Sequence, residues 1–302
     1  IERRIKMKYV IETKELKKIY SNFTLDETDL KIPCGFCTAV IGTNGSGKTT
    51  LLDILAGVLP KSSGEIIYFE NNNDTEKIKE KTGYCPSQNF YPLTWSAKDI
   101  CKSCNIAFDN FDKKRFYQIC EKLKIKTDTK TFSQPLSKLS DGNKMKLYLA
   151  SVLARDTDIL ILDEPTANLD PLIRDIINDL FRQYLDNGNG DKSIIFSTHN
   201  ISDAENITDY AVFIDDGKII EKGFTEDLKE KYIIVHGDTL NSKYVQKSLL
   251  TCSQNKTSYS GLALAQKRSL FENTGALCEA PTLSQLSIEI LKMSSLKKEV
   301  SL

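Results

Sequence analysis

The hydrophobic pattern alternates short apolar runs with longer segments in which apolar residues recur at helical spacing. Short buried strands are predicted at 38–41, 158–162 and 193–197. Helices are predicted over 48–56, where Gly57 follows as a stop signal, over 171–185, and across most of 94–126. Short apolar strands that alternate with helices are typical of a parallel sheet covered on both faces. The pattern therefore predicts an α/β fold.

The two ends of the chain depart from this pattern. Residues 7–35 alternate apolar and polar positions, and Pro33 and Gly35 mark a turn, which predicts an antiparallel strand pair. After Gly223, strands at 231–235 and 258–265 and a helix at 284–293 predict a small α+β extension. We expect a main domain over 7–223 and an accessory domain over 224–302, with 1–6 a leader or cloning remnant before a natural start at Met7.

Composition excludes several classes of protein. The 302 residues are 40% hydrophobic and 27% charged, with zero formal net charge and a pI near 6.9. Nucleic-acid-binding proteins usually carry a basic excess or stripe, so no nucleic-acid partner is expected. No run approaches the roughly 18 apolar residues of a membrane span, and no signal-like apolar core begins the chain. The expected location is the cytoplasm, with any membrane role supplied by a partner.

Eight cysteines raise the question of a metal site. Cys34 and Cys37, and Cys101 and Cys104, have the two-residue separation of zinc-ligand pairs. However, Cys37 opens an apolar strand where a small hydrophobe suffices, and the second pair lies on a predicted helix more than 60 residues later. We therefore expect neither zinc nor a disulfide.

The clearest chemical motif is GTNGSGKT at 42–49, between a predicted strand and a predicted helix. Its glycines permit positive φ angles and let backbone N–H groups point at phosphate oxygens. The helix that follows adds its N-terminal dipole. Lys48 supplies a charge for the β- and γ-phosphates, and the Thr49 hydroxyl is a ligand for Mg²⁺. The motif predicts binding of ATP with Mg²⁺.

Other polar motifs stand at fixed distances from this loop. Asp163 and Glu164 end a buried strand, where ligands lie in open α/β sheets and where carboxylates hold Mg²⁺ or activate water. The sequence LSDGN at 139–143 places Ser140 23 residues before Asp163, Gln88 lies 40 residues after Lys48, and His199 lies 35 residues after Glu164.

Together these motifs resemble the nucleotide-binding subunit of ATP-binding cassette (ABC) transporters, over about 7–223. The resemblance implies a P-loop NTPase cassette, with a RecA-like core, an antiparallel β subdomain and a helical subdomain at about 92–153. It implies that Asp163, Thr49 and Gln88 hold Mg²⁺, with Glu164 as general base and with His199 and Gln88 as further catalytic residues. The implied nucleotide contacts are Tyr20, Gly42, Asn44, Gly45, Ser46, Gly47, Lys48, Thr49, Thr50, Ser140, Gly142 and Asp170.

Three of these assignments have competing structural interpretations. Tyr20 matches the family's adenine-stacking aromatic residue, but a lone Tyr is more often a packing residue. His199 is one of only two histidines, and a single His is usually structural or exposed. The signature also departs from the family's Leu-Ser-Gly-Gly-Gln, because Asp141 and Asn143 replace a glycine and the glutamine. We expect Asp141 to point away from the nucleotide.

In the family, Ser140 and Gly142 reach the ATP held by a second subunit, so the resemblance implies a head-to-tail dimer. The single cassette and its helical insert of about 50 residues resemble ATPase subunits of bacterial exporters for lantibiotics, peptide toxins or drugs. Such a subunit would lie at the cytoplasmic face of the membrane, on a separate transmembrane permease. The alternatives are an importer ATPase and a non-transport ABC ATPase in translation, DNA repair or iron–sulfur assembly.

Overall fold

A computed structural model describes residues 7–69, 75–88, 90–202, 205–238 and 247–301. Residues 1–6, expected to be a leader, lie outside these ranges. Six strands form the central sheet in the order β5-β6-β7-β3-β8-β9, and only the edge strand β9 is antiparallel to its neighbour. These strands are β3 (Cys37–Ile41), β5 (Thr82–Cys85), β6 (Ile159–Leu162), β7 (Ser193–Thr198), β8 (Tyr210–Asp215) and β9 (Lys218–Phe224).

The three predicted buried strands are confirmed as β3, β6 and β7, in which every residue is buried. Because side chains alternate across a strand, the sheet serves two cores. Ile161 and Ile195 face α1 (Lys48–Leu55), whereas Leu160 and Ile194 face α6 (Asp141–Leu153) and α7 (Pro171–Asp186). This two-sided burial explains why these strands are continuously apolar.

A second sheet covers the other side of α1. It has the order β2-β1-β4 and is antiparallel, with β1 (Tyr9–Ile19), β2 (Thr24–Pro33) and β4 (Ser63–Tyr68). The predicted strand pair is confirmed, but the hairpin turn lies at 20–23, and the turn at Pro33 and Gly35 leads into β3 instead. Strand β4 carries too little apolar alternation to be predicted.

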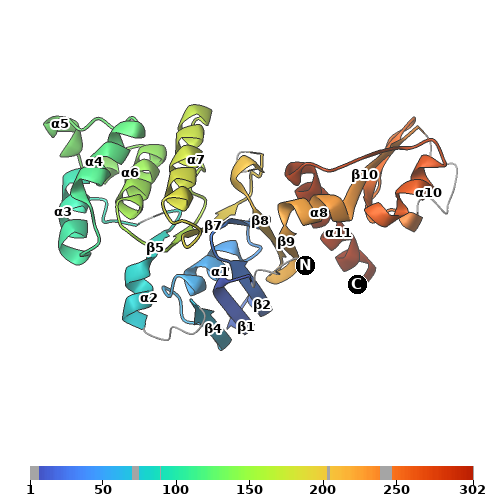
Figure 1. The fold of residues 1–302 in the computed structure, drawn as a ribbon, viewed down its shortest axis with the longest axis horizontal. Coiled ribbons are helices and arrows are strands. Elements are labelled where there is room, and N and C mark those ends of the chain that lie inside the picture. Colours follow the sequence, from blue (N-terminus) through green and yellow to red (C-terminus); the bar gives the residue numbers. More distant parts are fainter. Residues whose placement is uncertain (1–6, 70–74, 89, 203–204, 239–246, 302) are drawn as a thin grey trace.

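Helices form the part drawn in green at the left of Figure 1. They are α3 (Ala97–Ala107), α4 (Lys113–Lys122), α5 (Thr129–Phe132), the 3₁₀ turn η1 (Leu136–Lys138) and α6, and α2 (Thr75–Lys81) precedes β5. The predicted helical character of 94–126 is confirmed. Ser96, Asp112, Ser140 and Asp170 each cap the N-terminus of a helix through their side chains, which fixes where α3, α4, α6 and α7 begin.

The C-terminal elements form a separate α+β layer at the right of Figure 1. An antiparallel sheet has the order β11-β12-β10-β13, with β10 (Tyr232–Gly237), β11 (Ser253–Gln254), β12 (Tyr259–Leu264) and β13 (Leu277–Glu279). The helical elements of this layer are α8 (Thr225–Lys231), η3 (Ala265–Lys267), α10 (Arg268–Glu272) and α11 (Leu283–Ser301). The 3₁₀ turn η2 (Glu205–Ile207) belongs to the core, between β7 and β8. The predicted strands and final helix are confirmed, although α11 runs further than 293. No helix in the described ranges has the length and apolarity needed to cross a membrane.

Candidate nucleotide-binding site

The loop at 42–49 turns tightly between β3 and α1. Gly45 and Gly47 have φ angles of 80° and 106°, in the left-handed region that favours glycine. Gly42 is equally constrained, since a Cβ there would lie 2.3 Å from the Ile214 carbonyl oxygen. The buried Ser46 hydroxyl has no hydrogen-bond partner within the described residues. Such an unsatisfied buried group fits a loop that is built to receive another polar group, such as a phosphate.

Lys48 is folded back on its own loop. Its ammonium, only 6% exposed, donates to the carbonyl oxygens of Gly42 (2.9 Å) and Thr43 (3.1 Å). It also lies 3.7 Å from Glu164 Oε1. A buried lysine that spans the loop in this way supplies a fixed positive charge at the α1 N-terminus, where an anion is already favoured.

Asp163 joins three elements through its two carboxylate oxygens. Oδ2 accepts a hydrogen bond from Thr49 Oγ1 at 2.9 Å, and Oδ1 accepts one from Ser197 Oγ at 2.5 Å. The Ser197 hydroxyl in turn accepts from the Glu164 backbone N–H at 2.9 Å. Thr49 and Asp163 therefore present hard oxygen ligands side by side. Ser197 orients both acidic residues, and sequence reasoning had assigned it no role.

Glu164 lies between the lysine and the histidine. Its Oε2 is 2.9 Å from His199 Nδ1, and its φ angle of 50° is unusual for a residue that is not glycine. Backbone strain of this kind concentrates at functional sites. Gln88, Asn44, Glu164 and His199 line one cleft of about 310 Å³. The structure thus brings together side chains that the sequence separates by more than 100 residues.

The signature segment borders the same cleft. Ser140 caps α6 and accepts from the Asn143 N–H at 3.3 Å. A Cβ at Gly142 would meet the Asn168 carbonyl oxygen at 3.1 Å, so this glycine permits close packing within its own chain. The Asp141 side chain is 82% exposed at the border of the cleft, and the expectation that it points away from a bound nucleotide stays a prediction. Asp141 lines the cleft with Lys144, and that ammonium, 2.9 Å away, pairs with its charge.

Of the predicted nucleotide contacts, Asn44 lines this cleft, and Asp170 and Tyr20 are not among its lining residues. The Asp170 carboxylate caps α7 by accepting from the Ile173 N–H at 3.1 Å. Tyr20 is 41% exposed at the β1–β2 turn. The Phe23 ring lies beside the loop, since a Cβ at Gly47 would lie 2.8 Å from its Cζ atom. The sequence offered no signal that Phe23, three residues after Tyr20, packs there.

Residues of β5 and α1 lie next to the acidic pair Asp163 and Glu164. The Asp163 N–H donates to the Cys85 carbonyl at 2.8 Å, which joins β6 to β5. Burial raises the pKa of the Cys85 thiol, and the Asp163 charge adds to this, so the thiol stays neutral. Tyr84 donates to the Asp53 carboxylate on α1, and burial followed by that contact raises the pKa of Tyr84. Both groups therefore act as uncharged structural supports.

The cysteine pairs have ordinary structural surroundings. All eight cysteines are free thiols, and Cys37, Cys101 and Cys104 are buried in the main core. Within the described ranges, no cluster of three or more His, Cys, Asp or Glu side chains has a metal-binding arrangement.

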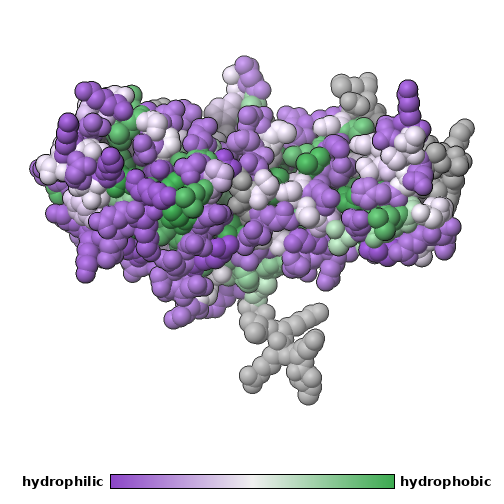
Figure 2. Space-filling view, turned by 90° about the horizontal axis from the view of Figure 1, so that it is seen from above, coloured by the Kyte–Doolittle hydropathy of each residue, from purple (hydrophilic) through white to green (hydrophobic). Residues whose placement is uncertain are grey.

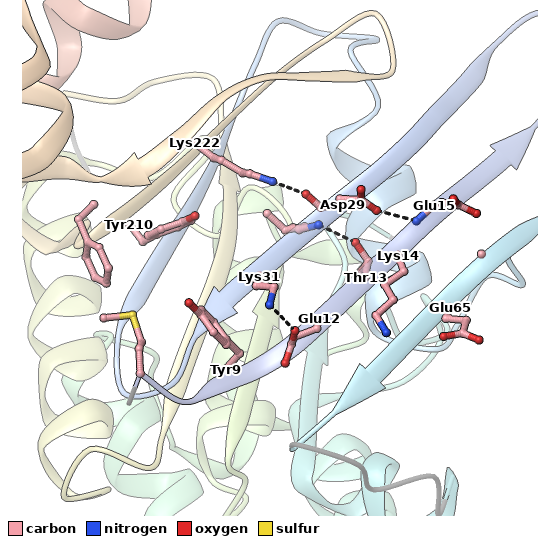
Figure 3. A pocket seen from close by; sticks show the side chains of 14 residues that line it. Tyr9, Glu12, Thr13, Lys14, Glu15, Asp29, Lys31, Glu65, Tyr210 and Lys222 are labelled. Carbon is pink, nitrogen blue, oxygen red and sulfur yellow. Dashed lines mark hydrogen bonds and ion pairs between the residues drawn. The ribbon is translucent and has the colours of Figure 1, made fainter. Parts of the chain in front are cut away.

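A hollow of about 950 Å³ lies away from the phosphate loop. Figure 3 shows it on the strands of the antiparallel sheet, with Tyr9 and Tyr210 at one end. Its charged side chains bond to one another and to the backbone. Lys31 pairs with Glu12 at 3.0 Å, and Lys222 donates to the Asp29 carbonyl. None of the predicted site residues lines this hollow.

Comparison with known proteins decides the family. A family model described as "ABC transporter" matches residues 25–167. The lantibiotic transport ATP-binding protein SrtF of Streptococcus pyogenes is 31% identical over 227 residues, which are 74% of this chain and 96% of SrtF. The chain belongs to the ABC transporter family. It carries the ATP-binding cassette of an ABC ATPase.

Other ABC relatives differ in their named tasks. The petrobactin import ATP-binding protein YclP of Bacillus subtilis is 28% identical over 74% of this chain and 91% of YclP. Human ATP-binding cassette sub-family A member 9 is 33% identical over 74% of this chain. The chain spans only 14% of the length of that relative.

Solved structures share the fold of the cassette. The structure of cbiO1 from Clostridium perfringens, part of the transporter complex cbiONQ, is 27% identical with a TM-score of 0.58, covering 73% of this chain and 90% of its own. A dimeric post-hydrolysis state of the cassette MJ0796 with ADP and Pi has a TM-score of 0.61 at 21% identity, covering 71% and 98%. The predicted fold class is confirmed.

Proposed function

We propose that this ABC ATPase powers export of peptides or drugs through a separate transmembrane permease, as a head-to-tail dimer with itself. The observation that carries the proposal is the set of contacts beside the phosphate loop that involve Lys48, Asp163, Glu164 and His199, in a chain that matches SrtF over nearly all of SrtF's length. The name of SrtF, a lantibiotic transport ATP-binding protein, supports a lantibiotic-like peptide as the transported substrate.

The chemistry follows from the contacts at this cleft. Phosphoryl transfer to water requires in-line positioning and neutralisation of the γ-phosphate charge. Lys48 is held where that charge would develop. Glu164 accepts a proton from water, and His199 holds the Glu164 carboxylate in place through the 2.9 Å contact.

The residues around Asp163 fit a magnesium ion. The Asp163 carboxylate, the Thr49 hydroxyl and the Gln88 amide oxygen are hard ligands of the kind Mg²⁺ prefers, and the first two already lie within 2.9 Å of each other. When bound, the ion would neutralise phosphate charge. Ser197, which orients Asp163, would set the direction of that ligand.

The dimer supplies the other half of the proposed site. We infer that Ser140 and Gly142 of a second copy close over ATP on the phosphate loop. The dimeric MJ0796 cassettes support this arrangement, and the Asp141–Lys144 pair supports it by neutralising a carboxylate beside a phosphate. Tyr20 and Asp170 remain proposed contributors to nucleotide binding in that dimer.

We further propose a cassette over 7–223, with helical subdomain 92–153, and an accessory unit over 224–302. The end of β9 at Phe224 and the start of α8 at Thr225 support this division. The permease would dock beside Gln88 and the helical subdomain, where Leu93 is 46% and Ile106 is 73% exposed. Figure 2 shows that the largest hydrophobic area of the upper face lies on the left half, over the helices.

Inside-out membrane vesicles test the direction of transport. Vesicles that contain this chain and its co-purified permease should accumulate labelled amphipathic peptide only with ATP, and a Lys48→Ala variant should not. ATP-driven uptake into right-side-out vesicles would instead favour an importer, as in YclP. Co-purification with ribosomes or DNA and with no membrane protein would favour a non-transport ATPase.

A further inference from the structure

The turn between β8 and β9, residues 215–217, packs directly against the phosphate-binding loop. The Gly217 N–H donates to the Ser46 carbonyl at 2.9 Å, and the Ile214 carbonyl leaves no room for a Cβ at Gly42. On its other side, the Gly217 carbonyl accepts from the Asp26 N–H of β2 at 2.8 Å. A movement of this turn would therefore displace the backbone that surrounds the phosphate site.

Helix α11 holds the same turn from the C-terminal side. Ser294 Oγ and Lys298 Nζ both bond to Asp215 Oδ2 at 2.8 Å, and Lys298 lies 3.4 Å from Asp216. Asp215 is 14% exposed and Ser294 is 8% exposed, so water competes little for the Ser294 contact. The helix makes this contact with the nucleotide-binding core from its last two turns.

The first turn of α11 is fixed to the core as well. The Leu283 N–H and the Ser284 hydroxyl both donate to the Glu205 carboxylate, at 2.8 and 3.1 Å. The helix thus has two attachments on the core, one near each end. Figure 1 shows α11 beside α8 at the right of the molecule.

A cavity of about 510 Å³ separates α11 from the loop itself. Thr43 of the loop and Ile288, Leu291 and Leu296 of the helix line it. Across this gap, α11 reaches the loop through the 215–217 turn, where the Asp215 carboxylate accepts from both Ser294 and Lys298.

We propose that Asp215 is a positioning residue for ATP hydrolysis, through which α11 holds the 215–217 turn against the phosphate-binding loop. The C-terminal elements then set the geometry of the ATP site, and a displacement of α11 slows hydrolysis. This inference rests on the chain's ATPase chemistry and does not depend on whether the transported substrate is exported or imported.

Two variants and a matched control test the proposal in the full-length chain. Asp215→Asn removes the charge at the turn, and Lys298→Met removes the 47%-exposed partner on the helix, which leaves the core intact. Lys292→Met is the control, because the partners of Lys292 within the described ranges are Glu289 of the same helix (2.7 Å) and Ser253 of the C-terminal sheet (3.4 Å), and neither belongs to the 215–217 turn. The readouts are kcat and KM for ATP, and amide hydrogen exchange of residues 42–50 without nucleotide.

Both test variants should exchange faster at 42–50 and lose between about twofold and tenfold in kcat, with a smaller change in KM. The double variant should lose no more than Asp215→Asn alone, and Lys292→Met should match wild type. The proposal is overturned if exchange and kcat of both test variants equal those of Lys292→Met, or if the two losses simply add. The exchange measurement keeps the test decisive even if the isolated chain hydrolyses ATP too slowly to measure.

Discussion

At the scale of single residues, the Ser197 hydroxyl contacts both residues of the acidic pair, Asp163 and Glu164. Ser197 bonds at once to the Asp163 carboxylate (2.5 Å) and to the Glu164 N–H (2.9 Å). Residues that orient a metal ligand or catalytic group typically affect activity although they do not touch the reacting atoms. The buried strand end that carries Ser197 makes this contact rigid.

Replacement of Ser197 by Ala should lower kcat by about tenfold and weaken the dependence on Mg²⁺, because both acidic residues lose their shared partner. Steady-state ATPase assays across a Mg²⁺ titration measure this. Ser193→Ala is the control, since Ser193 lies on the same strand, is equally buried and accepts a hydrogen bond from Gly35 away from the site. Equal kcat in the two variants, at similar stability, would remove Ser197 from the positioning role.

At the scale of elements, the phosphate-binding loop depends on backbone shapes that only glycine adopts easily. Gly47 has φ 106°, and a Cβ added there would lie 2.8 Å from the Phe23 ring. Gly57, at the other end of α1, has φ 70°, and a Cβ added there would meet no atom within 4 Å. A side chain at either position would strain the backbone, but only a side chain at Gly47 would also crowd the Phe23 ring. Comparing the two substitutions therefore distinguishes backbone strain from crowding.

Gly47→Ala should cost about 1–3 kcal/mol of strain in the loop and reduce ATP affinity at least about tenfold. Gly57→Ala should cost about 1 kcal/mol of stability and leave ATP affinity unchanged. Fluorescent-nucleotide titration and thermal unfolding of both variants check this. Normal ATP binding by Gly47→Ala would show that the loop tolerates another shape.

A second element-scale contact joins the core to the C-terminal layer. The Glu221 carboxylate of β9 accepts from Lys231 and Tyr232, each at 2.5 Å. Burial acts to raise the pKa of Glu221, but these hydrogen bonds outweigh it, so its pKa lies below the usual 4.5. A carboxyl with a lowered folded-state pKa stabilises the fold above its unfolded pKa, and this stabilisation is lost as pH falls through the folded value.

Glu221→Gln should therefore lower the free energy of unfolding by about 1 kcal/mol at pH 7, and the difference from wild type should shrink below pH 4.5. Urea denaturation of both proteins at pH 7 and again below pH 4.5 measures this difference in the free energy of unfolding. Glu226→Gln is the control, because Glu226 is 80% exposed in its pair with Lys229 and should matter little at either pH. A difference that stays constant with pH would contradict the assignment.

At the scale of the whole molecule, the proposed composite site combines two parts of the chain. One part is the phosphate-binding loop between β3 and α1. The other is the signature segment, in which Ser140 caps α6 and Gly142 lies close to the segment that precedes α7. A second copy placed head to tail would join them, and ATP would be held between the two subunits.

Glu164→Gln should bind ATP, slow hydrolysis by about 10²-fold or more, and accumulate as a dimer with ATP but not with ADP. Size-exclusion chromatography with light scattering measures the mass. Adding Ser140→Arg to this variant should return it to a monomer that still binds ATP. Near-normal turnover by Glu164→Gln would remove Glu164 from the base role, and persistent dimers in the double variant would place the interface elsewhere.

The amino-acid sequence by itself determined the buried strands, the phosphate-binding loop and the spacing of its polar partners. These features are local, because a continuously apolar run, a glycine at a tight turn or a helix cap depends on neighbours a few residues away. The same local logic predicted the strands and helix of the C-terminal layer.

Only the tertiary structure decided which side chains share contacts. The Ser197 bridge, the Phe23 ring beside Gly47, the Asp141–Lys144 pair at the cleft and the hold of α11 on Asp215 all join segments, or set directions, that periodicity leaves open. The position of a residue relative to a predicted strand indicates at which edge of the sheet the residue lies. It does not fix which way a polar side chain turns there, because that depends on partners supplied from distant parts of the fold.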